Sequence, residues 1–168
     1  GVGERLITSK SEPVFGGVYK LAAVEDDAGH IIPRIKISEN PAKVTTPHFK
    51  KVYRIFEEDS GKAIADLITV HDEAPDPEQP LELFDPDAVW KRKTIERFRM
   101  EELLVPVFQK GELVYDLPDI ETLRQRCARE LDRQWDEVKR FENPHNYYVD
   151  LSQKLWDIKA QLLKDAKA

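Results

Sequence analysis

The spacing of apolar residues changes once along this chain, at Pro118, and that change constrains the fold more than any other feature. Before Pro118, apolar residues alternate with polar ones in short runs that end at glycine, proline or aspartate. After it, apolar residues recur three or four positions apart. A period of two is typical of strands, and a period near 3.6 is typical of amphipathic helices. We therefore expect an α+β fold, antiparallel and β-rich over the first two thirds, followed by two C-terminal helices.

Four strands are predicted in the first seventy residues. Residues 18–24 and 31–37 flank a turn rich in aspartate and glycine, and Ile35 and Ile37 should face the core. A second pair, residues 51–57 and 63–70, is joined by a hairpin turn in which Gly61 can adopt a positive φ. We expect these strands to form one small antiparallel meander with one face buried.

The next stretch, residues 72–87, contains seven acidic side chains, four prolines and no basic residue. Proline removes a backbone donor, so this stretch is predicted to be a connector and not a central strand or a helix. It should be anchored only where Leu81, Leu83 and Phe84 meet a surface. Residues 103–108 and 113–115 flank Lys110-Gly111 and predict another hairpin, with Pro106 placing that strand at an edge.

The helical part begins at Pro118, which suits the first position of a helix. One apolar stripe follows, with a break expected at residues 132–134 and a stop at Asn143-Pro144. A final helix is expected to begin near Asp150, because Asp150 and Gln153 have capping-box spacing. The residues of the first stripe are Ile120, Leu123, Cys127, Leu131, Trp135 and Val138.

Composition excludes several classes of protein. The chain has 26 basic and 32 acidic residues, a net charge of −6, which disfavours a dedicated nucleic-acid binder. One cysteine, Cys127, allows no intrachain disulfide and no cysteine-based zinc site. No apolar run is long enough to span a membrane, and the opening residues do not form a signal peptide, so a cytoplasmic location is expected. The first residue is glycine, which suggests a segment of a longer chain.

The usual catalytic motifs are missing from the sequence. The four histidines are scattered without metal-ligand spacing, and there is neither a Gly-x-Ser-x-Gly motif nor a Walker loop. We therefore predict no catalytic residue and no metal ligand. The opening Gly1-Val2-Gly3 can bring backbone N–H groups close to a phosphate, although such a sequence also suits an ordinary turn. Glu4 would repel a phosphate there, and Arg5 is the nearby cation.

Five sequence blocks occur in a characteristic order. They read GVGERLITSKSEPVFGGVYKL, PRIKISENPAKVTTP, KKVYRIFEED, ELLVPVFQKGELVYDLP and ENPHNYYVDLS. In order and spacing, these blocks resemble the last third of nicotinate phosphoribosyltransferases, and the resemblance covers nearly the whole chain.

The resemblance implies an enzyme that forms nicotinate mononucleotide and pyrophosphate from nicotinate and phosphoribosyl pyrophosphate, coupled to ATP hydrolysis and requiring Mg²⁺. It implies an irregular α/β barrel with a β-containing side domain and a C-terminal extension. This chain would pack against the upstream catalytic barrel of the same protein, without contact to nucleic acid or membrane. A homodimer stays open for the parent enzyme.

Carried onto this chain, the resemblance implies that residues 1–48 end the catalytic core and residues 49–168 form the C-terminal domain. Gly1 and Gly3 become the expected backbone donors to the ribose phosphate, and Lys20 is structural or lies near that site. The family position of Glu4 is often threonine, so the resemblance gives Glu4 no role. The family's catalytic and metal-binding residues lie upstream of this chain. The chain alone is thus expected to be inactive and to bind neither Mg²⁺ nor ATP.

Two other hypotheses stay open at this point. One is an interaction module whose basic strand face binds an acidic partner or nucleic acid through Arg34, Lys36, Lys50 and Arg54. The other is a relative that acts on nicotinamide. If the chain folds alone, we also expect an exposed apolar patch near Val14, Phe15 and residues 81–84, through which the chain would self-associate.

Overall fold

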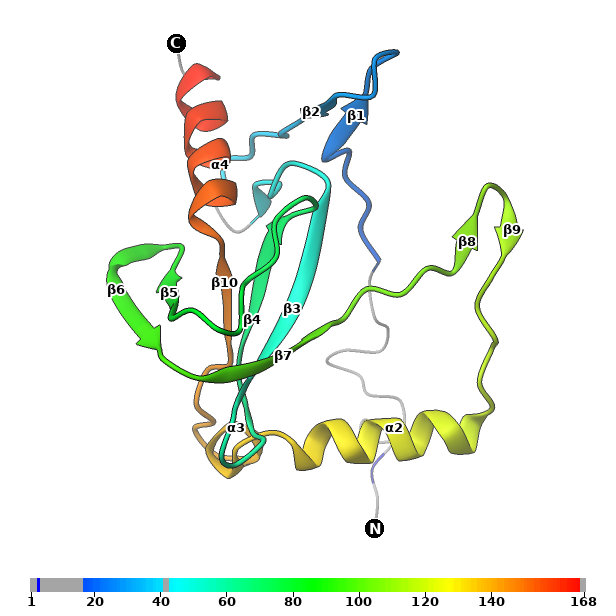
Figure 1. Cartoon of the computed structure of the whole chain (residues 1–168), viewed down its shortest axis with the longest axis vertical. Coiled ribbons are helices and arrows are strands. Elements are labelled where there is room, and N and C mark those ends of the chain that lie inside the picture. The colour runs from blue at the N-terminus through cyan, green and yellow to red at the C-terminus, as the bar shows by residue number, and fades with distance from the viewer. Residues whose placement is uncertain (1–2, 4–16, 41–42, 167–168) are drawn as a thin grey trace.

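A four-stranded mixed sheet forms the centre of the fold (Figure 1). The computed structural model describes Gly3, residues 17–40 and residues 43–166. β3 runs antiparallel to both of its neighbours, whereas β10 runs parallel to β4 at the edge. In spatial order, the strands are β10 (Tyr148–Leu151), β4 (Ala63–Val70), β3 (Lys50–Glu57) and β7 (Phe98–Glu102).

The β3–β4 hairpin confirms the second predicted strand pair. Its turn is closed by the Gly61 N–H, which donates to the Glu57 carbonyl at 2.9 Å. Gly61 has a φ of +65°, and an added Cβ would lie 3.4 Å from the Arg99 guanidinium. Glycine is therefore favoured here by backbone conformation, whereas the flexible Arg99 side chain leaves room for a Cβ.

The first predicted strand pair is shorter than expected and stands apart from this sheet. β1 (Ala23–Glu25) and β2 (Ile31–Pro33) form their own two-stranded sheet, so the predicted four-stranded meander is wrong. The Ala22 carbonyl accepts N–H groups from both Arg34 and His48, each at 2.8 Å, so the chain leaves the strand direction after Pro33. Ile37, predicted to face the core, is 47% exposed.

The predicted connector also contains a strand, which corrects the expectation for its second half. β5 (Leu81–Asp85) pairs with β6 (Ala88–Ile95) as an antiparallel hairpin. The prolines do not prevent this pairing, because three precede β5 and Pro86 lies in the turn. Leu83 and Ile95 are buried with Tyr53, Ile55, Ala65, Leu67 and Phe98, so the β5–β6 hairpin covers one face of the central sheet.

Burial of this hairpin overturns the expected apolar patch at residues 81–84. Leu83 and Phe84 are 4% and 3% exposed. The other residues of that predicted patch, Val14 and Phe15, lie outside the described residues.

Two long helices follow at opposite ends of the sheet (Figure 1). α2 (Ile120–Asp132) is capped by Asp119, whose carboxylate accepts the Thr122 N–H at 2.7 Å. Pro118 thus precedes the cap and does not occupy the first helical position. The helix ends at the predicted break, and a single turn, α3 (Asp136–Lys139), follows.

The final helix, α4 (Gln153–Asp165), begins later than predicted. Its cap is Ser152, whose hydroxyl accepts the Leu155 N–H at 3.3 Å, and Asp150 belongs to β10 instead. Leu155 is fully buried against Val70 and Leu151, and α4 thereby covers the sheet face opposite the β5–β6 hairpin.

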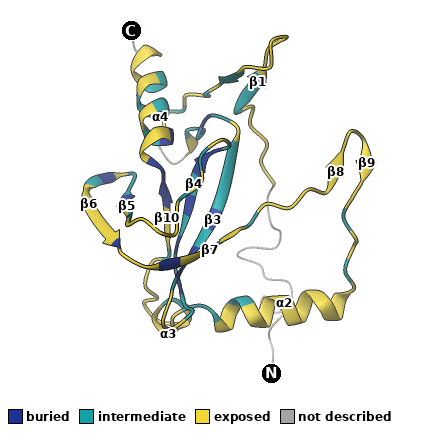
Figure 2. Cartoon of the chain, in the orientation of Figure 1, coloured by how far each residue is buried: buried dark blue, intermediate teal, exposed yellow. Residues whose placement is uncertain are grey.

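The predicted hairpin around Lys110-Gly111 is present but short. β8 (Phe108–Gln109) and β9 (Glu112–Leu113) flank a turn in which Lys110 and Gly111 have φ values of +51° and +85°. This hairpin projects away from the sheet, and both it and α2 are largely exposed (Figure 2). Among the described residues, no helix combines the length and the apolar character needed to cross a membrane.

Candidate functional site

The predicted phosphate site falls mostly outside the described residues. Gly1, Glu4 and Arg5 lie there, whereas Gly3 is described and exposed. An added Cβ at Gly3 would meet nothing within 4 Å. The phosphate-binding role of Gly1 and Gly3 therefore stays a prediction.

Lys20 makes a contact within the fold. Its side chain is exposed, and its ammonium donates to the backbone carbonyl of Lys43. This hydrogen bond joins the segment before β1 to the segment before β3, which favours the structural role over a position near a ligand.

The predicted basic strand face is not formed as one surface. Arg34 and Lys36 are exposed on the segment after β2, whereas Lys50 and Arg54 lie on β3. The Lys50 ammonium donates at 2.9, 3.3 and 2.7 Å to three backbone carbonyls, and burial lowers its pKa. The three carbonyls belong to Thr46, Pro47 and His48. Lys50 thus closes a loop of its own chain and is not presented to a partner.

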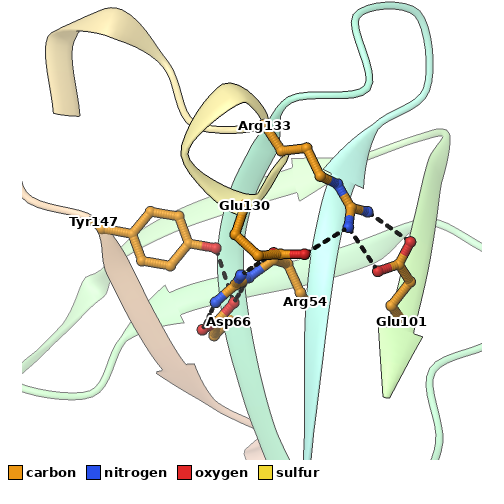
Figure 3. Close-up of polar contacts among 6 residues, drawn as sticks. All are labelled: Arg54, Asp66, Glu101, Glu130, Arg133 and Tyr147. Carbon is orange, nitrogen blue, oxygen red and sulfur yellow. Dashed lines mark hydrogen bonds and ion pairs between the residues drawn. The ribbon is translucent and has the colours of Figure 1, made fainter. Parts of the chain in front are cut away.

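The fourth residue of that face, Arg54, belongs to a polar network (Figure 3). Its guanidinium binds Asp66 on β4 through two hydrogen bonds of 2.8 and 3.0 Å. Its remaining terminal nitrogen donates to Glu130 of α2 at 2.9 Å. The Tyr147 hydroxyl donates to the same Asp66 carboxylate at 2.8 Å. Hydrogen bonding to Asp66 raises the pKa of Arg54, and burial together with Asp66 raises the pKa of Tyr147.

The network continues through Arg133, at the C-terminal end of α2. Arg133 donates to both oxygens of Glu101 on β7, at 2.6 and 2.9 Å, and to Glu130 at 3.3 Å. This pairing lowers the pKa of Glu101 and raises that of Arg133. The Arg133 guanidinium carbon also lies 3.8 Å from the centre of the Phe56 ring. Each carboxylate of the network is matched by an arginine, so the network fastens α2 across three strands and leaves no unpaired acid for catalysis.

A cavity of about 440 Å³ lies between the β5–β6 hairpin and the β10 edge of the sheet. Its apolar walls include Leu83, Phe84, Trp135 and Tyr148. Asp150 also lines it, from β10. The volume lies within the range of small-molecule sites, which are also mostly apolar with a few polar groups.

Asp150 is the most unusual residue in this cavity. It aligns with Leu67 across the β4–β10 pairing, so its side chain lies on the core face of the sheet. Asp150 is only 5% exposed, and its carboxylate receives no hydrogen bond or ion pair from the described residues. Burial raises its pKa to about 6, and the nearby Asp85 adds repulsion. Charged groups are rarely buried without a partner, because they lose their hydration.

Sequence reasoning missed this cavity. The four residues of β10 are too few to show a period, and the spacing of Asp150 and Gln153 favours a helix cap at Asp150. One signal in the sequence is Ser152, because serine is as good a helix cap as aspartate. A cap at Ser152 places Asp150 in the preceding strand.

The fold is that of an α+β domain, in which the polar network attaches α2 to one mixed sheet. The family model described as Nicotinate phosphoribosyltransferase C-terminal domain matches residues 49–159. The chain belongs to this family, which confirms the resemblance found in the five sequence blocks.

Relatives in other organisms agree with this assignment. A nicotinate phosphoribosyltransferase of Bacillus subtilis is 39% identical over 168 residues, which cover 100% of this chain and 34% of that protein. The human nicotinate phosphoribosyltransferase is 33% identical over 156 residues, covering 92% of this chain and 28% of that protein. The chain thus spans about a third of the length of the curated relatives it matches.

A solved structure supports the fold. The crystal structure of human nicotinic acid phosphoribosyltransferase superimposes with a TM-score of 0.63 at 25% sequence identity. The match covers 70% of this chain and 23% of that one.

Proposed function

We propose that this chain is the C-terminal part of a nicotinate phosphoribosyltransferase. The whole enzyme would form nicotinate mononucleotide and pyrophosphate from nicotinate and phosphoribosyl pyrophosphate, with ATP hydrolysis and Mg²⁺, in the salvage of NAD in the cytoplasm. The observation that carries this proposal is the family match over residues 49–159. Names of the relatives point to nicotinate and not to nicotinamide.

Within that enzyme, we divide the chain into two parts. Residues 1–48 would end the catalytic core, with Gly1 and Gly3 giving backbone N–H groups to the ribose phosphate. Residues 49–168 would form the C-terminal domain. Mg²⁺ and ATP would act in the catalytic barrel, and a homodimer is the assembly to test for the whole protein.

The exposed apolar surface suggests where the catalytic barrel would dock. No residue of α2 is buried, although its stripe includes Ile120 and Leu123, which are 77% and 47% exposed. The β8–β9 hairpin adds Phe108 and Leu113, which are 66% and 51% exposed. Apolar surface of this extent is typical of a contact face. The missing two thirds of the relatives' length would supply the covering surface.

The chain alone should have no transferase activity. Transfer of a ribosyl group needs a shielded pocket that stabilises positive charge and a bound pyrophosphate leaving group. Among the described residues there is no cluster of three or more His, Cys, Asp or Glu side chains that could hold a metal ion. The test is formation of nicotinate mononucleotide by the purified chain. Turnover like that of a complete enzyme would refute the proposal.

A chimera tests whether the chain can serve as the C-terminal part of a nicotinate phosphoribosyltransferase. This chain would replace the matching third of the Bacillus subtilis relative, and nicotinate transfer should persist. The control is the same enzyme lacking that third, which should be inactive. A folded chimera without activity would contradict the assignment.

A further inference from the structure

The cavity beside β10 contains a buried acid that the fold does not neutralise. Asp150 is 5% exposed, on the core face of the sheet, and no described side chain or backbone group donates to it. By contrast, the acids of the polar network, Asp66, Glu101 and Glu130, are each paired with arginine. The isolation of Asp150 is therefore local and does not reflect a shortage of cations in the molecule.

Most of the other charged groups that line the cavity have contacts of their own, and Glu57, a further lining carboxylate, accepts a hydrogen bond from Ser60. Lys91 lies 3.6 Å from Asp85, and the Arg92 guanidinium pairs with Glu82 and stacks 4.8 Å from the centre of the Phe84 ring. Lys93 is exposed on β6. Asp85 places a second carboxylate near Asp150, and repulsion between the two further raises the pKa of Asp150. Among the charged groups of the cavity, only Asp85 contributes to the pKa shift of Asp150, so no cation neutralises that carboxylate.

The walls offer what a cationic ligand with an apolar body requires. Phe84, Trp135 and Tyr148 contribute aromatic surface, and the faces of aromatic rings attract cations. Leu83 and Ile64 add aliphatic surface. A protonated amine would donate hydrogen bonds to the Asp150 carboxylate and replace the hydration that burial removes.

We propose that this cavity binds a small organic ligand that carries a protonated amine on an aromatic or apolar body, with Asp150 as its counter-ion. Phe84, Trp135 and Tyr148 would hold the body of the ligand. The proposal uses only residues of the described fold, so it stands independently of the transferase activity proposed above.

The test compares three ligands of similar size and different charge. 2-Phenylethylamine, 2-phenylethanol and phenylacetate would be titrated into the 168-residue chain at neutral pH, with binding followed by calorimetry and by NMR shifts of the Trp135 indole. The amine should bind at least about tenfold more tightly than the alcohol, because the free energy of a buried hydrogen bond between charged groups corresponds to at least that factor in affinity. Phenylacetate should bind most weakly.

Two variants locate the interaction. Asp150→Asn keeps the shape of the side chain and removes its charge, and it should reduce amine affinity at least about tenfold while leaving alcohol affinity unchanged. Asp157→Asn makes the same charge change at an exposed position of α4 and should leave amine binding unchanged.

Several outcomes would overturn the proposal. They are tighter binding of phenylacetate than of the amine, equal binding of amine and alcohol, no saturable binding of the amine, or undiminished amine affinity in a folded Asp150→Asn variant. Tighter binding of N-acetyl-lysinamide than of 2-phenylethylamine would instead indicate a lysine of a partner protein. If Asp150→Asn fails to fold, the comparison of the three ligands on the unaltered chain still decides.

Discussion

The central sheet and α2 both carry apolar residues at regular spacing, but they differ sharply in burial. Five of the eight residues of β4 are buried, whereas α2 buries none of its thirteen (Figure 2). The two faces of the sheet are covered by other parts of the same chain, namely the β5–β6 hairpin and α4. α2 is fastened mainly by Glu130 and Arg133 at its end. The spacing of apolar residues thus predicts which face of a helix or strand is to be buried, but not whether the covering surface lies in the same chain.

The largest difference should appear between a core truncation and the same kind of truncation on α2. Ile55→Ala, at a position with no exposure, should lower the free energy of unfolding by about 4 kcal/mol. Leu123→Ala should change it by less than about 0.5 kcal/mol, since the side chain is exposed and alanine favours helix. Urea unfolding followed by circular dichroism measures both values. Equal losses would show that α2 packs on the body in solution.

Breaking the polar network should have the next largest effect. Asp66→Ala would leave Arg54 partly buried without its main partner, and we expect a loss of about 3 kcal/mol. The matched control is Glu121→Ala, which breaks the exposed pair with Arg124 on α2 and should cost less than about 1 kcal/mol. The same unfolding measurement applies. An Asp66→Ala loss no larger than that of the control would mean that the network contributes little.

Asp150 should make stability depend on pH. Its pKa rises from 3.8 in the unfolded chain to about 6 in the folded one, so the folded state binds the proton more tightly. The contribution of Asp150 to stability should therefore fall as pH rises from about 4 to about 6 and should then level off. Above that range, Asp150→Asn should be more stable than the unaltered chain by at most about 3 kcal/mol.

The control for the Asp150 prediction is Asp157→Asn, which makes the same chemical change at an exposed position of α4. Asp85, Glu57, Lys91 and Lys93 line the same cavity and remain in every variant. Thermal unfolding between about pH 4 and pH 8 would show the difference. Parallel curves for Asp150→Asn and the unaltered chain would contradict the assignment.

Cys127 provides the smallest and most direct test of the α2 surface. It is exposed in the middle of that helix and should react with a maleimide about as fast as an unfolded peptide thiol. In the active chimera, docking of α2 should slow its labelling at least about tenfold, as read from the Cys127 peptide by mass spectrometry. An unchanged rate would place the docking face elsewhere.

Local patterns predicted the parts of the fold that local interactions determine. The β3–β4 hairpin, the Lys110-Gly111 turn and the break after α2 each depend on a few neighbouring residues. The family resemblance also came from contiguous sequence blocks, and the family match confirms it.

The misses share a different cause, because they depend on contacts between distant residues. β5 packs on the sheet through Leu83, and the prolines in the same stretch concealed this strand. β6 carries three basic residues in succession and β7 ends in two acidic residues, so neither strand shows a clear alternation of apolar and polar positions. The cavity around Asp150 brings together residues that lie between positions 57 and 150, far apart in the sequence, so no local pattern could indicate it.

The position of β10 has a consequence for biosynthesis. β4 acquires its second neighbour only when residues 148–151 have been made, about eighty positions later. Until then, one edge of β4 has open amide and carbonyl groups, the condition that invites wrong pairing with another chain. Folding of this sheet should therefore finish only after residues 148–151 have been made, and any product that stops before Tyr148 should depend on chaperones to stay unaggregated.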